Sequence, residues 1–273
     1  MTDETAPAGP GTTLDPTRVE ELAAALHQAR LTRTPIPPLT DSEPGMTLWD
    51  GYAVQQAIVR RLLEGGDRVV GYKLGLTSKP MQKMLGVGSP DFAPVLAGHV
   101  NGDGEDIAVD KFIAPRIEAE IAFVLGEDLT GPDCTAIEVL QATAGVAAAL
   151  EIVDSRVADW KIKLPDTVAD MASCGAIVLS GRVVPVTYFD VRLVGMVLTR
   201  NGEVVATGAG AAALGNPAAA IAWLVNTLYP AGITLAAGHV VMTGALHAAV
   251  PVAAGDVFRA DFDRLGPVTA RMV

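Results

Sequence analysis

Apolar residues near the start of the chain recur at helical spacing. Over residues 15–33 they return every three or four positions and Thr17 offers an N-cap, so we predict an amphipathic helix there. The proline-rich residues 34–45 predict a loop. Residues 47–64 show the helical spacing again and are followed by two glycines, which predicts a second helix with a glycine stop. The first quarter of the chain is therefore expected to be helical.

From residue 68 onward the pattern changes to short β-type runs separated by turns. The predicted strands cover residues 68–75, 107–113, 117–126, 175–181, 194–208, 239–244 and 257–262. Asn201–Gly202 separates two alternating apolar runs and predicts a hairpin. Residues 75–98 predict a mobile loop, and helices are expected over about 135–149 and over 216–228. Because the strands do not alternate regularly with helices, the predicted fold class is α+β with a mixed, rolled sheet.

The composition allows a large apolar core but no basic surface. The chain has 273 residues, half of them apolar, and a formal net charge of -11. This charge argues against nucleic-acid binding, which needs cations to neutralise phosphates. It does not exclude an anionic substrate, because a bound metal ion can invert the local sign of the potential.

Cysteine use and the N-terminal residues indicate the compartment. Cys134 and Cys174 are the only cysteines, which favours a reducing environment over a disulfide framework. Residues 1–14 are acidic and rich in Pro, Gly and Thr, so we expect a disordered leader and no signal peptide. The Ala/Val-rich residues 142–150 are too short to cross a bilayer. A cytoplasmic protein that enters no membrane is expected.

Three glutamates form the main candidate site. Glu118 and Glu120 are two apart in a β-type run, so their side chains leave the same face of the strand. Their repulsion costs roughly 0.2–1 kcal/mol or more, which a shared cation would relieve. Glu151 follows the predicted helix over 135–149 between apolar neighbours. Three carboxylates without cysteine favour Mg²⁺ or Mn²⁺. Spacing alone leaves open a solvated strand face with Glu151 in an ordinary salt bridge.

Two further motifs carry candidate chemistry. Lys73 lies near a strand end between Gly71 and Gly75, which would let a ligand approach closely. A desolvated lysine beside a metal can have a lowered pKa and move protons, although a surface lysine is the alternative. Thr243–Gly244 ends a strand and can offer N–H groups and a hydroxyl to a carboxylate. A simple strand-to-turn transition is the alternative there.

Several segments together resemble the 2-keto-4-pentenoate hydratases. These enzymes belong to the fumarylacetoacetate hydrolase superfamily, as do the 4-oxalocrotonate decarboxylases. The matching segments are GYKLGLTS, PRIEAEIAFVLG, ALEIVDSRVADWKIK, DTVAD, the run from Asn201 to Leu228, and the ending from Ala254. The resemblance implies a mixed, barrel-like sheet of the fumarylacetoacetate hydrolase C-terminal type with an N-terminal helical portion. The expected division is a leader over 1–14, a helical portion over 15–66 and a catalytic domain over 67–273.

The resemblance also implies roles for individual residues. Mg²⁺ or Mn²⁺ would be held by Glu118, Glu120 and Glu151. Lys73 and Asp91 would be the catalytic residues. Substrate contacts would come from Leu76, Ser173, Thr243 and Gly244. Lys163 would support the metal shell.

The implied activity is a metal-dependent hydratase of aromatic meta-cleavage catabolism. It would add water to a 2-hydroxy-2,4-dienoate to give a 4-hydroxy-2-oxo acid. A 4-oxalocrotonate-type decarboxylase, or another keto-acid lyase or hydrolase of the superfamily, is the nearest alternative. A non-catalytic binding subunit is a third. The resemblance implies a small 2-keto or enol acid as substrate and a homo-oligomer, and it leaves open a complex with a pathway decarboxylase.

The chain departs from the family pattern at three positions. Met171 stands where Asn is expected, Cys174 where Ser is expected, and Ala93 where Gly is usual. The first two changes remove hydrogen-bonding groups, so we expect a bulkier or less polar keto acid. His247 could supply another polar contact, or be a surface loop histidine. Cys174 is not expected to be a nucleophile, because no histidine lies near it in the sequence.

Overall fold

Helices occupy the N-terminal part of the chain and strands most of the rest. The computed structural model describes residues 11–78, 82–83 and 87–273. The α-helices are α1 (Pro16–Thr32), α2 (Leu39–Ser42), α3 (Leu48–Glu64), α5 (Ala136–Ala142), α6 (Leu164–Ala169) and α7 (Pro217–Leu228). The short 3₁₀ helices are η1 (Ala97–His99), η2 (Val109–Lys111), η3 (Ala158–Trp160), η4 (Met171–Ser173), η5 (Val186–Tyr188), η6 (Val191–Leu193), η7 (Gly210–Ala212) and η8 (Tyr229–Ala231). This arrangement is the α+β class that the sequence predicts.

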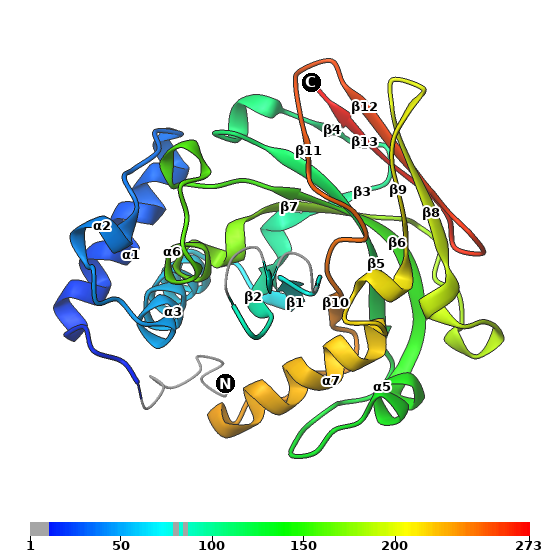
Figure 1. Ribbon diagram of the computed structural model, residues 1–273, viewed down its shortest axis with the longest axis horizontal. Coiled ribbons are helices and arrows are strands. Elements are labelled where there is room, and N and C mark those ends of the chain that lie inside the picture. The colour runs from blue at the N-terminus through cyan, green and yellow to red at the C-terminus, as the bar shows by residue number, and fades with distance from the viewer. Residues whose placement is uncertain (1–10, 79–81, 84–86) are drawn as a thin grey trace.

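The larger of two sheets curls into a partial barrel (Figure 1). Its strands, in spatial order, are β2 (Asp91–Leu96), β1 (Val69–Gly75), β10 (Val240–Met242), β5 (Arg116–Leu125), β6 (Thr143–Val153), β7 (Cys174–Leu179) and β3 (Val100–Gly102), with β11 (Val250–Pro251) also paired to β5. The pairs β1–β10 and β3–β7 are parallel and the others antiparallel, so the sheet is mixed.

A second sheet packs against the convex side of the first. Its order is β4 (Asp106–Ile107), β13 (Gly266–Met272), β12 (Val257–Phe262), β8 (Gly195–Arg200) and β9 (Glu203–Ala209). Strands β12 and β13 lie on β6, and β13 also lies on β7. The predicted hairpin is confirmed, because Asn201 and Gly202 join β8 to β9 with positive φ values of 55° and 89°. Strand β13 was not among the predicted strands.

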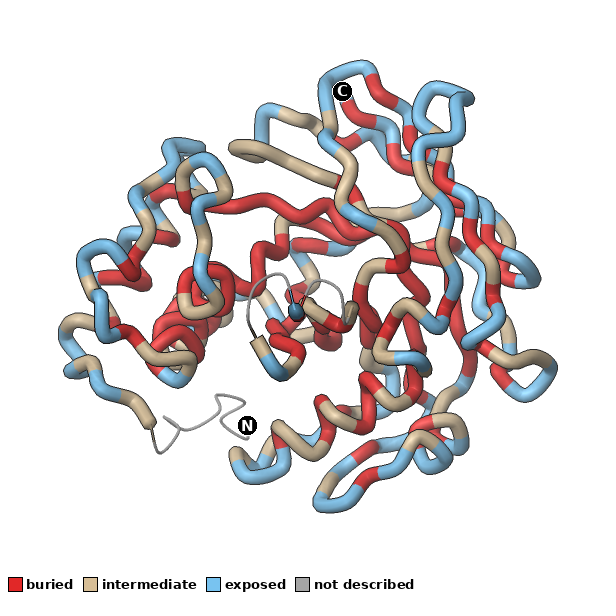
Figure 2. Tube along the Cα trace, viewed as in Figure 1, coloured by how far each residue is buried: buried red, intermediate tan, exposed pale blue. Residues whose placement is uncertain are grey.

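The middle strands of the large sheet are buried on both faces (Figure 2). On β5, Ile117, Ala119 and Ile121 enter the apolar core that the two sheets share. The alternate residues point to the concave side, which we call the inner face. There Ala122 packs in a small cluster with Val95, Ala149, Ile177 and Met242. The alternation therefore places the apolar residues of β5 in the core and leaves Glu118 and Glu120 on the inner face.

Helices α1 and α3 pack together beside the sheet, and α6 packs on α3 (Figure 1). The N-cap of α1 is Asp15, and not Thr17 as predicted, because the Asp15 carboxylate accepts from the N–H groups of Thr17 and Arg18. Helix α2 falls inside the predicted loop 34–45. It is held there by Asp166, whose carboxylate accepts from the N–H and hydroxyl of Thr40.

Three other predicted elements differ from the structure. The helix predicted over 135–149 stops at Ala142, and β6 begins at Thr143, because this alanine-rich run is paired with β5 on one side and β7 on the other. Long-range pairing overrides the helix propensity of alanine. The predicted loop 75–98 contains the fully buried strand β2. Of the strand predicted over 107–113, only Ile107 lies in a strand (β4), and the 3₁₀ helix η2 occupies Val109–Lys111.

The described part of the expected leader is ordered. Residues 1–10 lie outside the described residues. Thr13 and Leu14, which we expected to be disordered, donate backbone hydrogen bonds to Asp50 Oδ1 at 2.7 and 2.9 Å. Asp50 also caps α3 through Thr47. A buried carboxylate near a helix N-terminus therefore fixes these residues.

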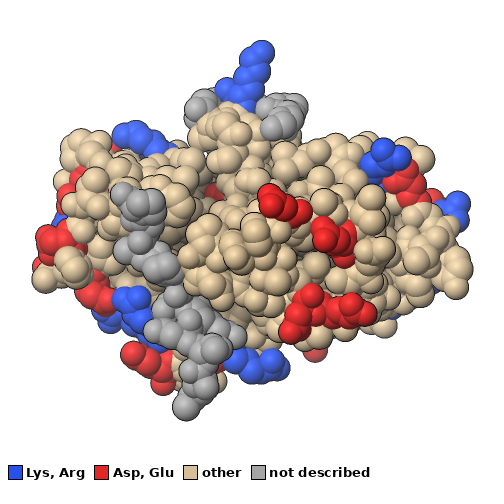
Figure 3. Space-filling view, turned by 90° about the horizontal axis from the view of Figure 1, so that it is seen from below, with Lys and Arg blue, Asp and Glu red and all other residues tan. Residues whose placement is uncertain are grey.

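Two further features are the burial of the most apolar helical segment and the distribution of charged side chains on the surface. The segment 210–231 is long and apolar enough to cross a membrane, but half of the scored window is buried inside the protein, as in a core helix. On the face shown in Figure 3, the described Lys and Arg side chains occur singly or beside acidic ones, without a continuous basic patch.

Candidate metal centre and active site

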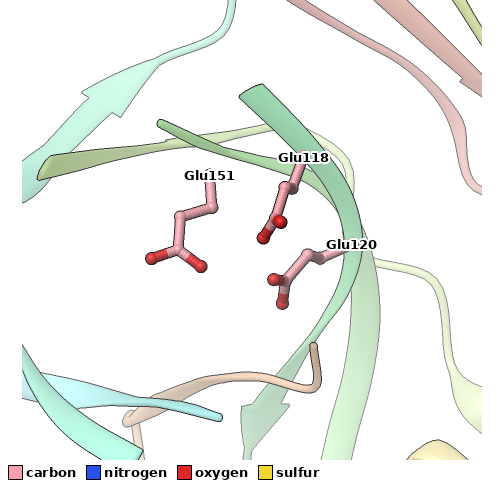
Figure 4. Close-up of side chains that lie close together, drawn as sticks. All are labelled: Glu118, Glu120 and Glu151. Carbon is pink, nitrogen blue, oxygen red and sulfur yellow. The ribbon is translucent and has the colours of Figure 1, made fainter. Parts of the chain in front are cut away.

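Strand pairing brings the three predicted glutamates together on the inner face. In the antiparallel pair β5–β6, Glu118 lies directly opposite Glu151, and Glu120 is two residues further along the same face. The three carboxylates point toward one another (Figure 4). One oxygen of each lies within 4.8 Å of the others. The prediction that Glu151 follows a helix is wrong, since it is part of β6. The cluster nevertheless forms, because the register of β6 places Glu151 opposite Glu118.

The curl of the sheet adds Lys73 to this cluster. Strands β1 and β6 are three places apart in the sheet order, a separation of about 14 Å in a flat sheet. In the curled sheet Lys73 Nζ lies 2.9 Å from Glu151 Oε1, and both side chains are buried. The ammonium also donates to the Ala172 carbonyl at 2.7 Å. Lys73 is therefore an interior residue of the site, and the surface alternative is wrong.

Asp91 is the first residue of β2, the strand next to β1. It lies opposite Gly75, and a Cβ at Gly75 would be 2.1 Å from Asp91 Oδ1. Only glycine leaves room for this carboxylate, so the group that approaches Gly75 is the Asp91 side chain. The expected approach of a ligand stays a prediction. Asp91 is 2% exposed, and its Oδ1 accepts no hydrogen bond from the described residues. Burial is the main cause that raises the pKa of Asp91 to about 6; Lys73 opposes it and Glu151 adds to it.

The carboxylates of the cluster repel one another strongly. Two unit charges 4.8 Å apart repel by about 3.5 kcal/mol at an effective dielectric constant of about 20. Burial and the charge of Glu151 raise the pKa of Glu118 to about 7. Burial and both neighbouring glutamates raise the pKa of Glu120 well above its usual range. Burial lowers the pKa of Lys73, but the combined effects of Glu151, Cys174 and Asp91 outweigh burial, so the pKa is raised. The lowered pKa that we expected for a lysine beside a bound metal ion stays a prediction.

The donor set fits a hard divalent cation. Oε1 of Glu120 and Oε2 of Glu151 are buried and accept no hydrogen bond within the described part of the chain. The other oxygen of Glu120 accepts from the Gly244 N–H at 2.7 Å, which fixes the carboxylate. Four carboxylates, including Asp91, face a single ammonium, so a cation would offset the excess negative charge. Oxygen ligands without sulfur or imidazole suit Mg²⁺ or Mn²⁺.

The four expected substrate-contact residues have different settings, and Gly244 is the one with a hydrogen bond to a glutamate of the cluster among the described residues. The Thr243 hydroxyl donates to the Ile121 carbonyl at 2.9 Å, so it holds β10 to β5. Gly244 has a φ of 103° and contacts Glu120 through its N–H. Leu76 has a φ of 55° next to the end of β1. The Ser173 hydroxyl lies 3.1 Å from the Thr167 hydroxyl.

A strained segment carries the carbonyl that Lys73 contacts. Met171, Ala172 and Ser173 have successive positive φ values of 56°, 47° and 58°, a conformation that non-glycine residues rarely adopt. Both ends of the segment are tied by Arg156, which donates to the carbonyls of Asp170 and Cys174 at 2.6 and 3.1 Å. These bonds fix the direction of the Ala172 carbonyl, a site feature that sequence reasoning missed and that no residue-type signal reveals.

Met171 and Cys174 pack away from solvent beside this segment. Both belong to the apolar cluster formed with α1 and α3, so the two departures from the family pattern change packing next to Lys73. Cys174 Sγ lies 3.7 Å from His99 Nδ1, a histidine that is distant in the sequence. Burial and Glu151 raise the pKa of Cys174 to about 12, and burial lowers that of His99 to about 3. The thiol is therefore protonated, in agreement with the expectation that it is no nucleophile.

Other residues near the site have different roles from those expected. His247 accepts from the Ala119 N–H at 2.9 Å and contacts its neighbour's carbonyl, so it braces β5. Lys163 is exposed at the start of α6, and no contact among the described residues joins it to the glutamates. Tyr52 of α3 was not singled out from the sequence. It stacks on Phe92 with ring centroids 4.6 Å apart, and burial and the charge of Asp91 raise its pKa.

Sequence comparison finds one matching family and close enzyme relatives. The family described as fumarylacetoacetate (FAA) hydrolase C-terminal matches residues 78–273. A 2-keto-4-pentenoate hydratase from Paraburkholderia xenovorans is 46% identical over 93% of this chain and 95% of its own length. A 2-hydroxyhexa-2,4-dienoate hydratase from Comamonas testosteroni is 42% identical over 91% of this chain and 95% of its own length.

Solved structures of other proteins share this fold, and some of them were solved with a divalent metal ion. The 4-oxalocrotonate decarboxylase from Pseudomonas putida G7, solved with magnesium and adipate, is 38% identical with a TM-score of 0.94, covering 96% of this chain and 100% of its own. A fumarylpyruvate hydrolase from Pseudomonas aeruginosa, solved with Mn²⁺ and pyruvate, is 18% identical with a TM-score of 0.61, covering 74% of this chain and 88% of its own. The second likeness concerns the fold alone.

Proposed function

The chain belongs to the fumarylacetoacetate hydrolase family, and on that premise we propose that it is a hydro-lyase, a divalent-metal-dependent hydratase. It would add water to a 2-hydroxy-2,4-dienoate of aromatic meta-cleavage catabolism and release a 4-hydroxy-2-oxo acid. The observation that carries the proposal is the buried cluster of Glu118, Glu120 and Glu151 with Lys73 beside it. Relatives named as hydratases, with 42–46% identity over most of the chain, support the same reaction class.

The three glutamates would hold Mg²⁺ or Mn²⁺. Two of their buried oxygens lack any partner among the described residues, and a cation would satisfy them. When bound, the ion supplies Lewis acidity toward the carboxylate and the 2-oxygen of the substrate. The related decarboxylase, solved with magnesium and with calcium, supports a divalent ion.

Lys73 and Asp91 are assigned the proton movement. Asp91 has a pKa of about 6, so near neutral pH it can accept a proton and return it. The ion pair with Glu151 keeps Lys73 as an ammonium that stabilises negative charge on the substrate. Together they would remove the proton of the 2-hydroxyl and protonate C5, which converts the dienol to a conjugated 2-oxo-3-enoate. Water then adds across that double bond, with its oxygen joining C4 and a proton joining C3.

A decarboxylase of the same superfamily is the second candidate. The observation that favours it is the TM-score of 0.94 to the 4-oxalocrotonate decarboxylase over almost the whole chain. Charge stabilisation at the 2-oxygen would serve either reaction, so the same glutamates and lysine fit both. The hydratase is preferred because the hydratase relatives are more similar in sequence, at 46% against 38% identity.

The test is product analysis with both substrates. Freshly generated 2-hydroxypenta-2,4-dienoate and 2-oxohex-3-enedioate are each supplied with Mg²⁺ and followed by NMR. A new C4 carbinol signal from the first supports hydration. Release of CO₂ from the second, without hydration of the first, would replace the proposal by the decarboxylase. Inertness toward both would contradict both assignments. A Glu118→Gln variant tested in parallel separates enzyme turnover from spontaneous ketonisation.

The cysteines and the exposed apolar side chains bear on the compartment and the assembly of the enzyme. We place it in the cytoplasm, because both cysteines are buried and free. We also propose a homo-oligomer, since exposed apolar side chains gather on and near the second sheet; they are Val197, Val204, Val205, Leu193 and Tyr188. Association with a decarboxylase of the same pathway is a further proposal. Light scattering of the purified protein, alone and mixed with such a decarboxylase, would measure both.

A further inference from the structure

A cavity lies away from the glutamates, between the end of α1 and the large sheet. Its volume is about 270 Å³. Four cationic side chains line it, and they are Arg30, Arg33, Lys111 and Arg156. Asp154 is its single acidic lining residue. In a chain with a net charge of -11, this local excess of positive charge is unusual.

Three of the four cations are unpaired. Across the residues that the structure describes, no ion pair or hydrogen bond engages the side chains of Arg30, Arg33 or Lys111. Arg156 is different, because it forms a buried ion pair with Asp170. The carboxylate of Asp154 accepts from the N–H groups of Ile113 and Ala114 at 2.7 to 3.1 Å and forms no ion pair among the described residues. Its single negative charge can offset at most one of the positive charges.

Positive charge is only partly compensated around Arg30. Burial and the neighbouring Arg156 lower the pKa of Arg30, and this lowering exceeds the opposing effect of Cys174, Asp170 and Asp154. Burial and Arg30 likewise lower the pKa of His27, on the same helix, and of His99 in η1. An anion placed among these groups would therefore relieve repulsion and gain charge-assisted hydrogen bonds.

The cavity is separate from the proposed active site. One of its walls is Ala176, which pairs with Ile152 in the β6–β7 ladder. Glu151 is the next residue on β6, so its side chain leaves the opposite face of the sheet. An occupant of the cavity would not contact the glutamate cluster.

We propose that this cavity is a binding site for a small anion that carries carboxylate or phosphate groups. Guanidinium groups present paired N–H donors that match both kinds of group, and Lys111 adds a point charge. The volume suits a compound of the size of a short dicarboxylic acid or a phosphate ester. This site goes beyond the proposed hydratase reaction and does not depend on it.

The test is calorimetric titration of the full-length, Mg²⁺-loaded protein with two probes, inorganic phosphate and succinate. We expect saturable binding of at least one probe, and the tighter one identifies the phosphate or the carboxylate class. The double variant Arg33→Gln/Lys111→Gln should bind at least tenfold more weakly. Both side chains are exposed, so the variant should fold, which a melting curve checks.

Two control variants locate the binding. Arg264→Gln makes the same kind of charge change at an exposed residue outside the cavity and should leave binding unchanged. Glu118→Gln alters the metal centre and should also leave it unchanged. The site is overturned by a lack of saturable binding for both probes, by equal binding in the double variant and the wild type, or by loss of binding in Glu118→Gln.

Discussion

Replacing Glu118 with glutamine should stabilise the metal-free protein while weakening metal binding. Glu118 is the cleanest position for this change, because no hydrogen bond or ion pair joins it to any residue the structure describes. Glu120 is bound by Gly244, and Glu151 by Lys73, so substitution of either would also break a local contact. Glutamine keeps the shape of the side chain, removes its charge and replaces one acceptor oxygen with an NH₂ donor.

The size of the effect follows from the geometry. Each charged neighbour within 4.8 Å costs about 3.5 kcal/mol at an effective dielectric constant of about 20. The pKa of Glu118 moves from 4.5 to about 7, which by linkage corresponds to on the order of 3 kcal/mol. The folded protein binds this proton more tightly than the unfolded chain does. The destabilisation of the folded protein by the Glu118 charge is therefore absent below about pH 4.5, grows as the pH rises, and is complete above about pH 7.

Thermal melting in EDTA measures the expected stabilisation of the metal-free variant, and thermal melting in Mn²⁺ measures its weaker metal binding. At pH 8 in EDTA, Glu118→Gln should melt roughly 5–10 °C above the wild type, and at pH 4.5 the two should coincide. In Mn²⁺ the wild type should gain about 2.7 kcal/mol at one hundred times its Kd, and the variant much less. Glu203→Gln, at an exposed position of the β9 hairpin, is the matched control and should change neither result. A variant that is less stable than the wild type in EDTA at pH 8, or equally stabilised by Mn²⁺, would refute the reasoning.

Three further substitutions test the remaining parts of the site. Lys73→Met should lower hydration by about 10²–10⁴-fold while Mn²⁺ still raises the melting temperature; normal turnover would exclude a catalytic role. Asp91→Asn should lower the rate and abolish the limb of the pH–rate profile near pH 6, and a limb that persists would assign it to another group. Gly244→Ala should cost about 1–2 kcal/mol in urea unfolding and weaken Mn²⁺ binding, because its φ is 103° and the new Cβ would lie 1.9 Å from Thr77 Oγ1; wild-type stability would contradict that clash.

The parts of the site that depend on local periodicity were predictable from the sequence. The two-residue spacing of Glu118 and Glu120 predicts a shared strand face, since side chains alternate along any strand. The same local rules predicted α3, α7 and the hairpin at Asn201. The mixed, rolled sheet followed from the order of strands and helices and from the family resemblance.

Features set by long-range pairing were not predictable from local patterns. The alanine-rich run before Glu151 has high helix propensity and is a strand only because β5 and β7 flank it. The ion pair between Lys73 and Glu151 requires the curl of the whole sheet. The Ala172 carbonyl reaches Lys73 through a left-handed segment that Arg156 ties at both ends. None of these contacts joins residues that are close in the sequence.

The central claim is that Glu118, Glu120 and Glu151 hold one divalent cation, and crystallography with Mn²⁺ tests it most directly. An anomalous difference map of crystals grown with Mn²⁺ should show one strong peak on the inner face of the sheet, about 2 Å from an oxygen of each glutamate. The peak should be absent from crystals of Glu118→Gln under the same conditions. A map without a peak between these carboxylates, or with its strongest peak elsewhere in the chain, would contradict the account.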